Sequence, residues 1–328
     1  MATPTQFAAK SLTALALILL SSCTSATPQA ATPRAMTPAA GTAAPTAPVK
    51  SGRSTINGID YYYEVHGTGQ PLLMLHGGLG SIDMFGPGQL MPRFTQGRQV
   101  IAVDLQGHGR TTLGTRPIRC EAIADDLDEL LAALGHGQVD VLGYSFGGCV
   151  ALRLAVQHPE HVRRLALVST TYADDGWYAD MREQQKQVNA SMAPMMAETP
   201  MYRGYKAVAP KDEFSRLLDA MGDFMRQKYD WSADVTKLKM PVMLVFGDAD
   251  MIRPEHEIKF YQLLGGGLKD AGWNRESMSK NRLAIIPDLT HYEAFTNAHM
   301  AETVMPFFEG ETGAKSPSAP VKAQPANE

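Results

Sequence analysis

The segment around Ser145 constrains the fold of this chain more than any other. A short β-branched run over residues 139–142 leads into a Gly-Tyr-Ser-Phe-Gly sequence centred on Ser145, and an amphipathic helix is expected over residues 147–157. A Gly-x-Ser-x-Gly pattern between a strand and a helix is typical of a sharp turn that strains the serine backbone and presents the hydroxyl at the top of a sheet. A chance match is the alternative in a chain with 29 glycines. The flanking strand and helix favour a serine nucleophile.

Strand and helix signals alternate along much of the chain. Asn57-Gly58 lies between two β-rich runs and indicates a hairpin over residues 54–65. Further strands are expected at residues 72–75, 99–105, 139–142, 164–169, 241–246 and 283–286, with helices at residues 120–134, 147–157 and 294–308. This alternation predicts an α/β fold with a doubly wound, mostly parallel sheet.

The alternation is interrupted between residues 170 and 239, where no strand signal is present. Two helical stretches, residues 176–197 and 211–229, are rich in Met, Tyr and Trp. Helices inserted between two strands predict a cap over one end of the sheet. Because Met is flexible and polarisable, some of these side chains are expected to line a pocket for apolar groups, and packing of the cap onto the sheet is their alternative role. The candidates are Met181, Met195, Met196 and Met221.

The groups that would activate a serine lie at other predicted strand ends. A serine hydroxyl needs a base to take its proton, and the base needs a carboxylate to hold its tautomer. Asp248 and Asp250 follow one late strand, and His291 follows the next. Of nine histidines, His291 is the one between the last strand and the last helix. The sequence therefore predicts Ser145 as nucleophile, His291 as base and one of the two aspartates as acid.

The chain order Ser, Asp, His and four separated motifs resemble the α/β-hydrolase superfamily, in its serine esterase type with a helical cap. The resemblance runs from about Ser54 to Phe308. It implies that the acid is Asp250 rather than Asp248, because in this family the acid lies three residues after the glycine that ends its strand. No cofactor is expected.

The oxygen of a tetrahedral intermediate needs two N–H donors. One donor is expected to be the backbone N–H of Phe146, the residue after the nucleophile. By resemblance the other is the N–H of Gly78, in the loop that begins at His76. Gly77 and Leu79 are the alternatives for this second donor.

The resemblance implies a serine hydrolase that cleaves carboxylic esters of small to medium apolar substrates through an acyl-enzyme. The same triad serves lactonases, amidases and carbon–carbon bond hydrolases, and the sequence does not separate these. A non-catalytic binding protein of the cell surface is an alternative of another class. The presence of nucleophile, acid, base and oxyanion loop together argues against it.

The first residues have the character of an export signal. Lys10 precedes an apolar run over residues 12–20, which is too short to span a bilayer, and Leu-Ser-Ser-Cys follows at residues 20–23. This ending resembles the lipobox of bacterial lipoproteins. The resemblance implies that Cys23 is lipidated and anchors the protein to the cell envelope, at the outer membrane if the host is Gram-negative. An ordinary secretory signal cut near Ala26, which would give a periplasmic or secreted protein, is the alternative.

Four parts of the chain are predicted from these patterns. They are a lipoprotein-type signal peptide over residues 1–23, a disordered Ala/Pro/Thr-rich tether over residues 24–51, the hydrolase domain over residues 52–309 with its cap at about 171–238, and a disordered tail over residues 310–328.

Composition limits the expected partners. A net charge of −4 gives no basis for nucleic-acid binding. Neither Cys-x-x-Cys nor His-Glu-x-x-His occurs, so the sequence predicts no metal site. Cys120 and Cys149 are expected to be unpaired thiols, with a disulfide as the alternative in an exported protein. The oligomeric state stays open.

Overall fold

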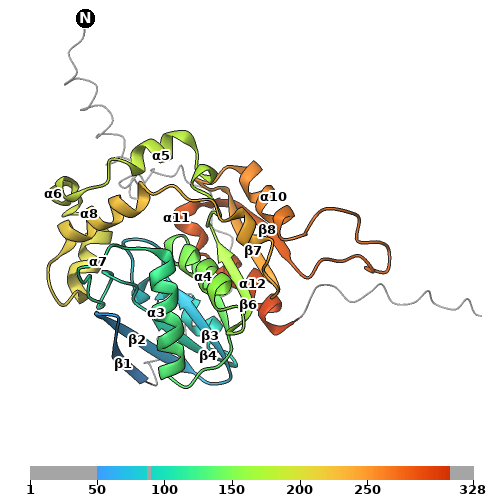
Figure 1. The fold of residues 1–328 in the computed structure, drawn as a ribbon, viewed down its shortest axis with the longest axis horizontal. Coiled ribbons are helices and arrows are strands. Elements are labelled where there is room, and N and C mark those ends of the chain that lie inside the picture. The colour runs from blue at the N-terminus through green and yellow to red at the C-terminus, as the bar shows by residue number, and fades with distance from the viewer. Residues whose placement is uncertain (1–49, 87–89, 311–328) are drawn as a thin grey trace, which may run out of the picture.

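The computed structural model describes residues 50–86 and 90–310, and Figure 1 shows how its elements are arranged. Eight strands form one sheet in the order β1-β2-β4-β3-β5-β6-β7-β8. The β1–β2 and β2–β4 pairs are antiparallel, and all later pairs are parallel. The predicted α/β fold with a mostly parallel sheet is therefore confirmed. The strands are β1 Lys50–Ile56, β2 Ile59–Gly67, β3 Gln70–Leu75, β4 Arg98–Val103, β5 Val139–Tyr144, β6 Val162–Val168, β7 Val242–Ala249 and β8 Arg282–Thr290.

The first two strands form the predicted hairpin. Asn57 and Gly58 both have positive φ angles, 47° and 81°, and Ile56 pairs with Ile59 across the turn. Two consecutive positive φ angles are what a tight hairpin turn needs, and Asn-Gly adopts them at little cost.

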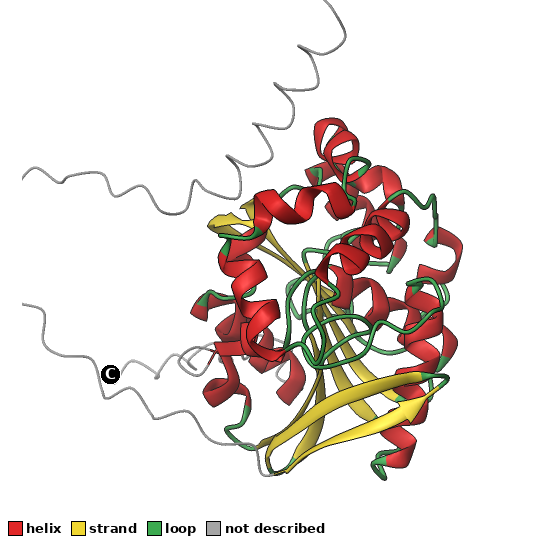
Figure 2. Ribbon diagram, turned by 90° about the vertical axis from the view of Figure 1, so that its left-hand side faces the viewer, coloured by secondary structure: helices red, strands yellow, loops and turns green. Residues whose placement is uncertain are grey.

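Helices cover both faces of the sheet, as Figure 2 shows edge-on. One face packs against α3 (Cys120–Ala133), α4 (Phe146–Gln157) and α10 (Pro254–Leu263). The other packs against α2 (Met91–Phe94) and α12 (Ala298–Glu309). Every residue of β5 is buried as a result, which explains why this strand reads as a nearly continuous apolar run.

The insertion between β6 and β7 is helical, and it lies above one end of the sheet in Figure 1. The sequence predicted longer helices over residues 176–197 and 211–229. The structure divides the first of these, because α5 ends at Gln185 and Pro194 stands in the first turn of a new helix, where a missing backbone N–H costs nothing. Pro200 begins a further helix, which lies between the two predicted stretches. The helices are α5 Ala179–Gln185, α6 Ala193–Met196, α7 Pro200–Val208, α8 Phe214–Met225 and α9 Ser232–Val235, with 3-10 turns η4 Asp174–Gly176 and η5 Ala190–Met192.

Cys120 and Cys149 form a disulfide, with their Cα atoms 6.0 Å apart, so the prediction of unpaired thiols is wrong. Cys120 is the first residue of α3, and Cys149 lies in the first turn of α4. A sequence separation of 29 residues carries no information on how two helices pack side by side. The bridge ties α3 to the helix that follows Ser145.

The N-terminal predictions lie almost wholly outside the described residues. These predictions are the signal peptide with Cys23 and most of the tether over residues 24–51. The predicted tail beyond residue 310 also lies outside the described residues. β1 begins at Lys50, inside the predicted tether. In the part of the chain that the structure describes, no helix has the length and apolar character needed to cross a membrane.

Candidate active site

Ser145 occupies the turn between β5 and α4, where it is the N-cap residue of α4 with a φ angle of 52°. A strained backbone conformation with positive φ costs a residue with a side chain about 1–3 kcal/mol, so the surrounding backbone must hold it. A Cβ on Gly143 would lie 2.4 Å from the carbonyl oxygen of Gly147, and a Cβ on Gly147 would lie 2.5 Å from that of His76. Both glycines are therefore required by the close approach of main chains. The turn sets the Ser145 hydroxyl at the end of the sheet.

Three side chains from separate strand ends meet beside this turn. Nε2 of His291 lies 3.0 Å from Oγ of Ser145, and Nδ1 of His291 lies 2.8 Å from Oδ1 of Asp250. Because an ionised carboxylate only accepts hydrogen bonds, Nδ1 carries the proton and Nε2 is left to accept the hydroxyl proton of Ser145. His291 and Asp250 are both buried. The three residues form a continuous hydrogen-bonded chain.

The structure brings Asp250, and not Asp248, to His291. Asp248 lies at the exposed end of β7, where its Oδ1 is 3.4 Å from the N–H of Leu289. Two residues further on, the chain has turned inward, and Asp250 lies against the imidazole. This is the geometry expected of the acid in a triad.

Ser169 holds the second oxygen of Asp250. Its hydroxyl donates a 2.5 Å hydrogen bond to Oδ2 of Asp250. Burial acts to raise the pKa of Asp250, but hydrogen bonds from His291 and Ser169 and the charge of His291 outweigh it, so the pKa of this carboxyl is lowered. Ser169 is not among the residues predicted from the sequence. The signal that could have found it is its place directly after β6, the strand beside the acid-bearing β7.

The position of His291 is fixed by its neighbours. The Tyr144 ring lies 5.4 Å from the His291 ring and stacks on Phe295 at 4.6 Å. Trp177, from the cap, meets the imidazole edge-to-face at 5.8 Å. His291 is also the first residue of the short helix α11 (His291–Ala294), whose capping box is formed by Thr290 and Glu293. The imidazole is thus packed against aromatic rings on several sides.

The predicted oxyanion donors, Gly78 and Phe146, lie next to each other. A Cβ on Gly78 would be 3.7 Å from Cβ of Phe146, and both residues line the same pocket as Ser145. In the described part of the chain, neither backbone N–H is bonded to a backbone or side-chain acceptor. Both donors are therefore free for an oxygen that develops negative charge near Ser145.

His76 shapes the loop that carries Gly78. Its Nδ1 donates a 2.8 Å hydrogen bond to the carbonyl of Gly77, and its Nε2 accepts one of 3.0 Å from the N–H of Leu105. Burial lowers the pKa of His76 to about 4, so the ring stays neutral and keeps one donor and one acceptor. This side chain organises the backbone and has no contact with Ser145.

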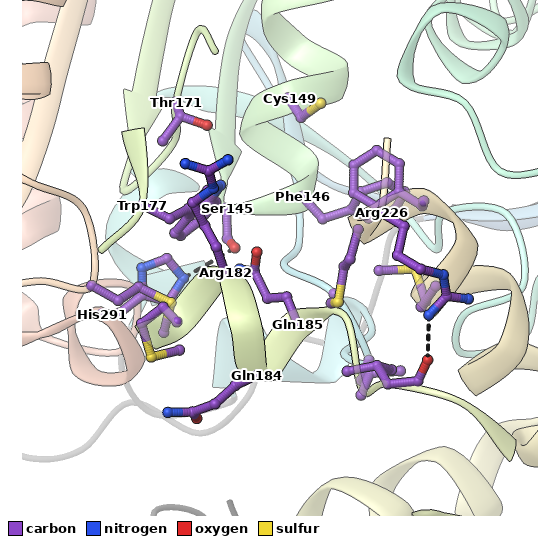
Figure 3. Close-up of a pocket in the computed structure, with 18 of the residues that line it drawn as sticks. Ser145, Phe146, Cys149, Thr171, Trp177, Arg182, Gln184, Gln185, Arg226 and His291 are labelled. Carbon is purple, nitrogen blue, oxygen red and sulfur yellow. Dashed lines mark hydrogen bonds between the residues drawn. The ribbon is translucent and has the colours of Figure 1, made fainter. Parts of the chain in front are cut away.

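A cavity of about 350 Å³ opens beside Ser145, and the cap contributes much of its wall. Figure 3 shows Ser145 and His291 on one side of it and Arg226 on the other. Of the four candidate methionines, Met181, Met196 and Met221 line the cavity, whereas Met195 is 45% exposed and lies outside it. Successive residues of a helix point about 100° apart, so on α6 only Met196 faces inward. Further thioether groups come from Met84, Met192, Met201, Met225 and Met251.

Polar and charged side chains also line the cavity. Arg182 pairs with Asp174 at 3.4 Å, and Arg226 donates to the carbonyl of Val188 at 3.0 Å. Gln184 and Lys228 also belong to the lining. The cavity therefore combines a mainly apolar lining with several polar and charged side chains.

A serine, an imidazole and a carboxylate linked in this way at the end of a doubly wound sheet define an α/β-hydrolase enzyme. The family model described as "alpha/beta hydrolase fold" matches residues 70–200. The pimeloyl-[acyl-carrier protein] methyl ester esterase of Neisseria meningitidis serogroup C is 31% identical over 245 residues, which are 68% of this chain and 89% of that protein. A candidate carbamate hydrolase, RutD, of Azorhizobium caulinodans is 31% identical over 253 residues, which are 70% of this chain and 91% of that protein. The chain belongs to the α/β-hydrolase fold family.

A solved structure supports the same fold. The thermophilic esterase of Thermogutta terrifontis superposes with a TM-score of 0.61 at 19% identity, covering 81% of this chain and all of that one (100%). At this identity the likeness concerns the fold and not the substrate.

Proposed function

We propose that this protein is a serine hydrolase that cleaves carboxylic esters of small to medium apolar acids. The observation that carries the proposal is the hydrogen-bonded chain from Ser145 through His291 to Asp250 at the wall of an apolar cavity. A thioether-rich wall suits flexible acyl groups. A small-molecule ester is thus the expected substrate.

In each half of the proposed reaction, His291 acts first as a base and then as an acid. His291 accepts the proton of Ser145 as Oγ attacks the ester carbonyl, and Asp250 stabilises the resulting imidazolium. The N–H groups of Phe146 and Gly78 bind the oxyanion. His291 then protonates the alcohol as it leaves. A water molecule then gives a proton to His291 and attacks the acyl-enzyme. The bond between the acyl carbon and Oγ breaks, His291 returns the proton to Ser145, and the acid is released.

Bond type is the open part of this proposal. Relatives in the same family carry names for different bonds, including a methyl ester esterase and a carbamate hydrolase. An alternative from the same machinery is therefore a lactonase, an amidase or a carbon–carbon bond hydrolase. The lining is mainly apolar, and this favours esters of apolar acids, because a further polar group on the substrate would lose its contacts with water there.

A panel of substrates tests the proposal. Purified protein is assayed with p-nitrophenyl esters of increasing acyl length, with lactones and with anilides, beside Ser145→Ala as control. Ester hydrolysis by the wild type that the variant loses supports the proposal. Hydrolysis that survives in Ser145→Ala contradicts it. Labelling of Ser145 by a fluorophosphonate separates an enzyme from a binding protein, because only an activated serine reacts.

We also propose that the protein is exported and held on the cell envelope by lipid on Cys23. The motif at residues 20–23 supports this, and so does the Cys120–Cys149 disulfide, because structural disulfides persist in oxidising compartments. Expression in a bacterial host with radiolabelled palmitate tests the proposal. Label is expected in the wild type and absent in Cys23→Ala. An unlabelled wild-type protein that is released in soluble form would instead indicate ordinary secretion.

A further inference from the structure

We infer that Asp128, His158 and His161 form a site for a divalent transition metal ion, with Zn²⁺ as the ion that fits best. The three side chains come from two segments that pack side by side. Asp128 belongs to α3, His158 is the C-cap residue of α4, and His161 lies between α4 and β6. The sequence contains no metal-binding signature because the ligands join only when the two segments pack.

The ligand atoms converge on one point. One atom from each residue lies within 4.8 Å of those of the other two. Nδ1 of His158 is 3.4 Å from Oδ2 of Asp128, and Nδ1 of His161 forms a hydrogen bond with Oδ1 of the same carboxylate. Zn–N and Zn–O bonds of about 2.1 Å in a tetrahedron place ligand atoms about 3.4 Å apart. Small side-chain adjustments are enough to close the site.

A backbone turn presents the two imidazoles together. The N–H of His161 donates to the carbonyl of His158 at 3.1 Å, across the intervening Pro159 and Glu160. The two rings stand parallel, with an interplanar angle of 3° and centroids 6.4 Å apart. This arrangement directs both Nδ1 atoms toward Asp128.

Asp125 supplies an independent indication. Its Oδ1 lies 2.8 Å from Nε2 of His158, the ring nitrogen that does not face Asp128. A histidine that binds a metal through one nitrogen commonly donates the other N–H to a carboxylate, which fixes the tautomer and strengthens the ligand. Asp125 and Asp128 are one helical turn apart on α3, so both reach the same imidazole.

The charge of the cluster also favours a cation. Within the described residues, neither Asp125 nor Asp128 forms an ion pair with a lysine or arginine. Two imidazoles and a carboxylate are donors that suit Zn²⁺. A metal ion bonds to an unprotonated ring nitrogen, so binding moves the Nδ1 proton of His161 to Nε2 or to water and breaks the hydrogen bond between His161 and Asp128. At His158 the proton stays on Nε2, which faces Asp125. The side chains of Asp128, His158 and His161 are 17%, 23% and 36% exposed, so an ion can enter and water can occupy the fourth position.

The site is separate from the catalytic centre. Ser145 caps the N-terminus of α4 and His158 caps its C-terminus, and a helix of this length spans about 18 Å. The ion would therefore not touch the substrate. Its effect would be to stabilise the contact between α3 and the end of α4, beside the start of β6.

To test the inference, the full-length protein is prepared without a histidine tag and treated with EDTA. It is then titrated with Zn²⁺. We expect one equivalent to bind, at least 10-fold weaker binding in Asp128→Asn and in His161→Gln, and a rise in Tm of about 5 °C at 100-fold excess over Kd. The kcat for ester hydrolysis should not change. His299→Gln is the matched control, because His299 contacts the single carboxylate of Glu302 at 3.1 Å on the surface without a second histidine.

Two results would overturn the inference. One is a wild-type protein that binds no stoichiometric Zn²⁺. The other is binding of equal strength in Asp128→Asn and His161→Gln, which would place the ion elsewhere. If a variant folds poorly, His158→Gln replaces it. Co²⁺ then supplies a second readout, since the wild type should show the visible absorption of a tetrahedral site and the variants should not.

Discussion

The hydroxyl of Tyr144, the residue before Ser145, donates a 2.8 Å hydrogen bond to the main-chain carbonyl of His291. Burial raises the pKa of Tyr144, so the hydroxyl remains a donor over the whole working range. Since the two residues are far apart in sequence, this bond ties the strand that carries the nucleophile to the loop that carries the base. The distance between Oγ and Nε2 therefore depends in part on Tyr144.

Tyr144→Phe is expected to lower kcat about 3- to 10-fold with little change in KM. The substitution removes one buried hydrogen bond, worth about 1 kcal/mol, and leaves the His291 carbonyl without its donor. Steady-state kinetics with one ester substrate measures the effect. A variant of equal stability that keeps the full kcat would show that Tyr144 does not position the base.

Substitution of the two neighbouring aspartates distinguishes the acid from its neighbour. Asp250→Asn should lower kcat about 10⁴-fold for two reasons. An amide at this position favours the wrong tautomer of His291, and it does not stabilise the imidazolium that forms during the reaction. Asp248→Asn is the matched control, and it should retain wild-type kcat. Within the described residues, the side chain of Asp248 accepts a hydrogen bond from the N–H of Leu289 and forms none with His291. A comparable loss in both variants would contradict the assignment.

Ser169 is expected to affect both the pH profile of kcat/KM and the pH dependence of the stability of the fold. Ser169→Ala removes a donor that lowers the pKa of Asp250, so the carboxyl should become protonated at higher pH. The acid limb of kcat/KM is then expected to move to higher pH, while activity at neutral pH changes less. In the wild type, the stabilisation from the lowered pKa is present above the unfolded value, about 3.9, and is lost as pH falls through the folded value.

A second variant at the same position distinguishes the effect of the hydroxyl from the effect of the backbone conformation. Ser169 has a φ angle of 50°, which glycine adopts without the cost of about 1 kcal/mol that alanine bears. Ser169→Gly and Ser169→Ala should therefore share one pH profile, and the glycine variant should be the more stable in urea. Profiles that differ between the two would show that the backbone, and not the hydroxyl, controls Asp250.

The Cys120–Cys149 disulfide should stabilise the fold by about 3–4 kcal/mol, the value expected for a loop of this length from the entropy of the unfolded chain. Urea unfolding of wild type and of Cys120→Ser/Cys149→Ser measures it. Dithiothreitol should lower the wild type to the level of the double variant and leave the variant unchanged. Equal stability with and without the bridge would refute this expectation.

The elements that carry Ser145, Asp250 and His291 could be predicted because each signal is local. The Gly-x-Ser-x-Gly turn is readable within a few residues, and the acid and base lie directly after strands. In a parallel sheet the carboxyl ends of strands meet at one edge, so three local patterns were enough to propose one site. The same logic predicted the α/β fold.

The remaining features depend on packing between segments distant in sequence. Ser169, the Cys120–Cys149 bridge and the pair of Asp128 with His161 each need two elements to be placed side by side before any contact exists. The sequence also did not show which of two adjacent methionines faces the cavity. Met195 is adjacent to Met196 and of the same type, and only the orientation of the one-turn helix α6 decides which of them faces the cavity.

The contrast between Met221 and Met195 allows a direct test of the acyl pocket. Met221 is buried and lines the cavity, and its Cε would lie 3.1 Å from a Cβ on Gly78. Met221→Ala lengthens the space beyond the oxyanion loop, so the preferred acyl chain should become longer by one or more carbons. Each added methylene that is buried contributes about 0.8 kcal/mol, or about 4-fold in kcat/KM.

Met195→Ala is the matched control for this prediction, because the same atoms are removed from an exposed position outside the cavity. It should change neither the acyl preference nor the stability, whereas Met221→Ala is expected to destabilise the protein by about 2–5 kcal/mol through the cavity that it leaves. The measurement is kcat/KM along a series of p-nitrophenyl esters, at a temperature where both variants are folded. An unaltered chain-length profile in Met221→Ala would mean that the acyl group does not reach Met221 and binds in another part of the cavity.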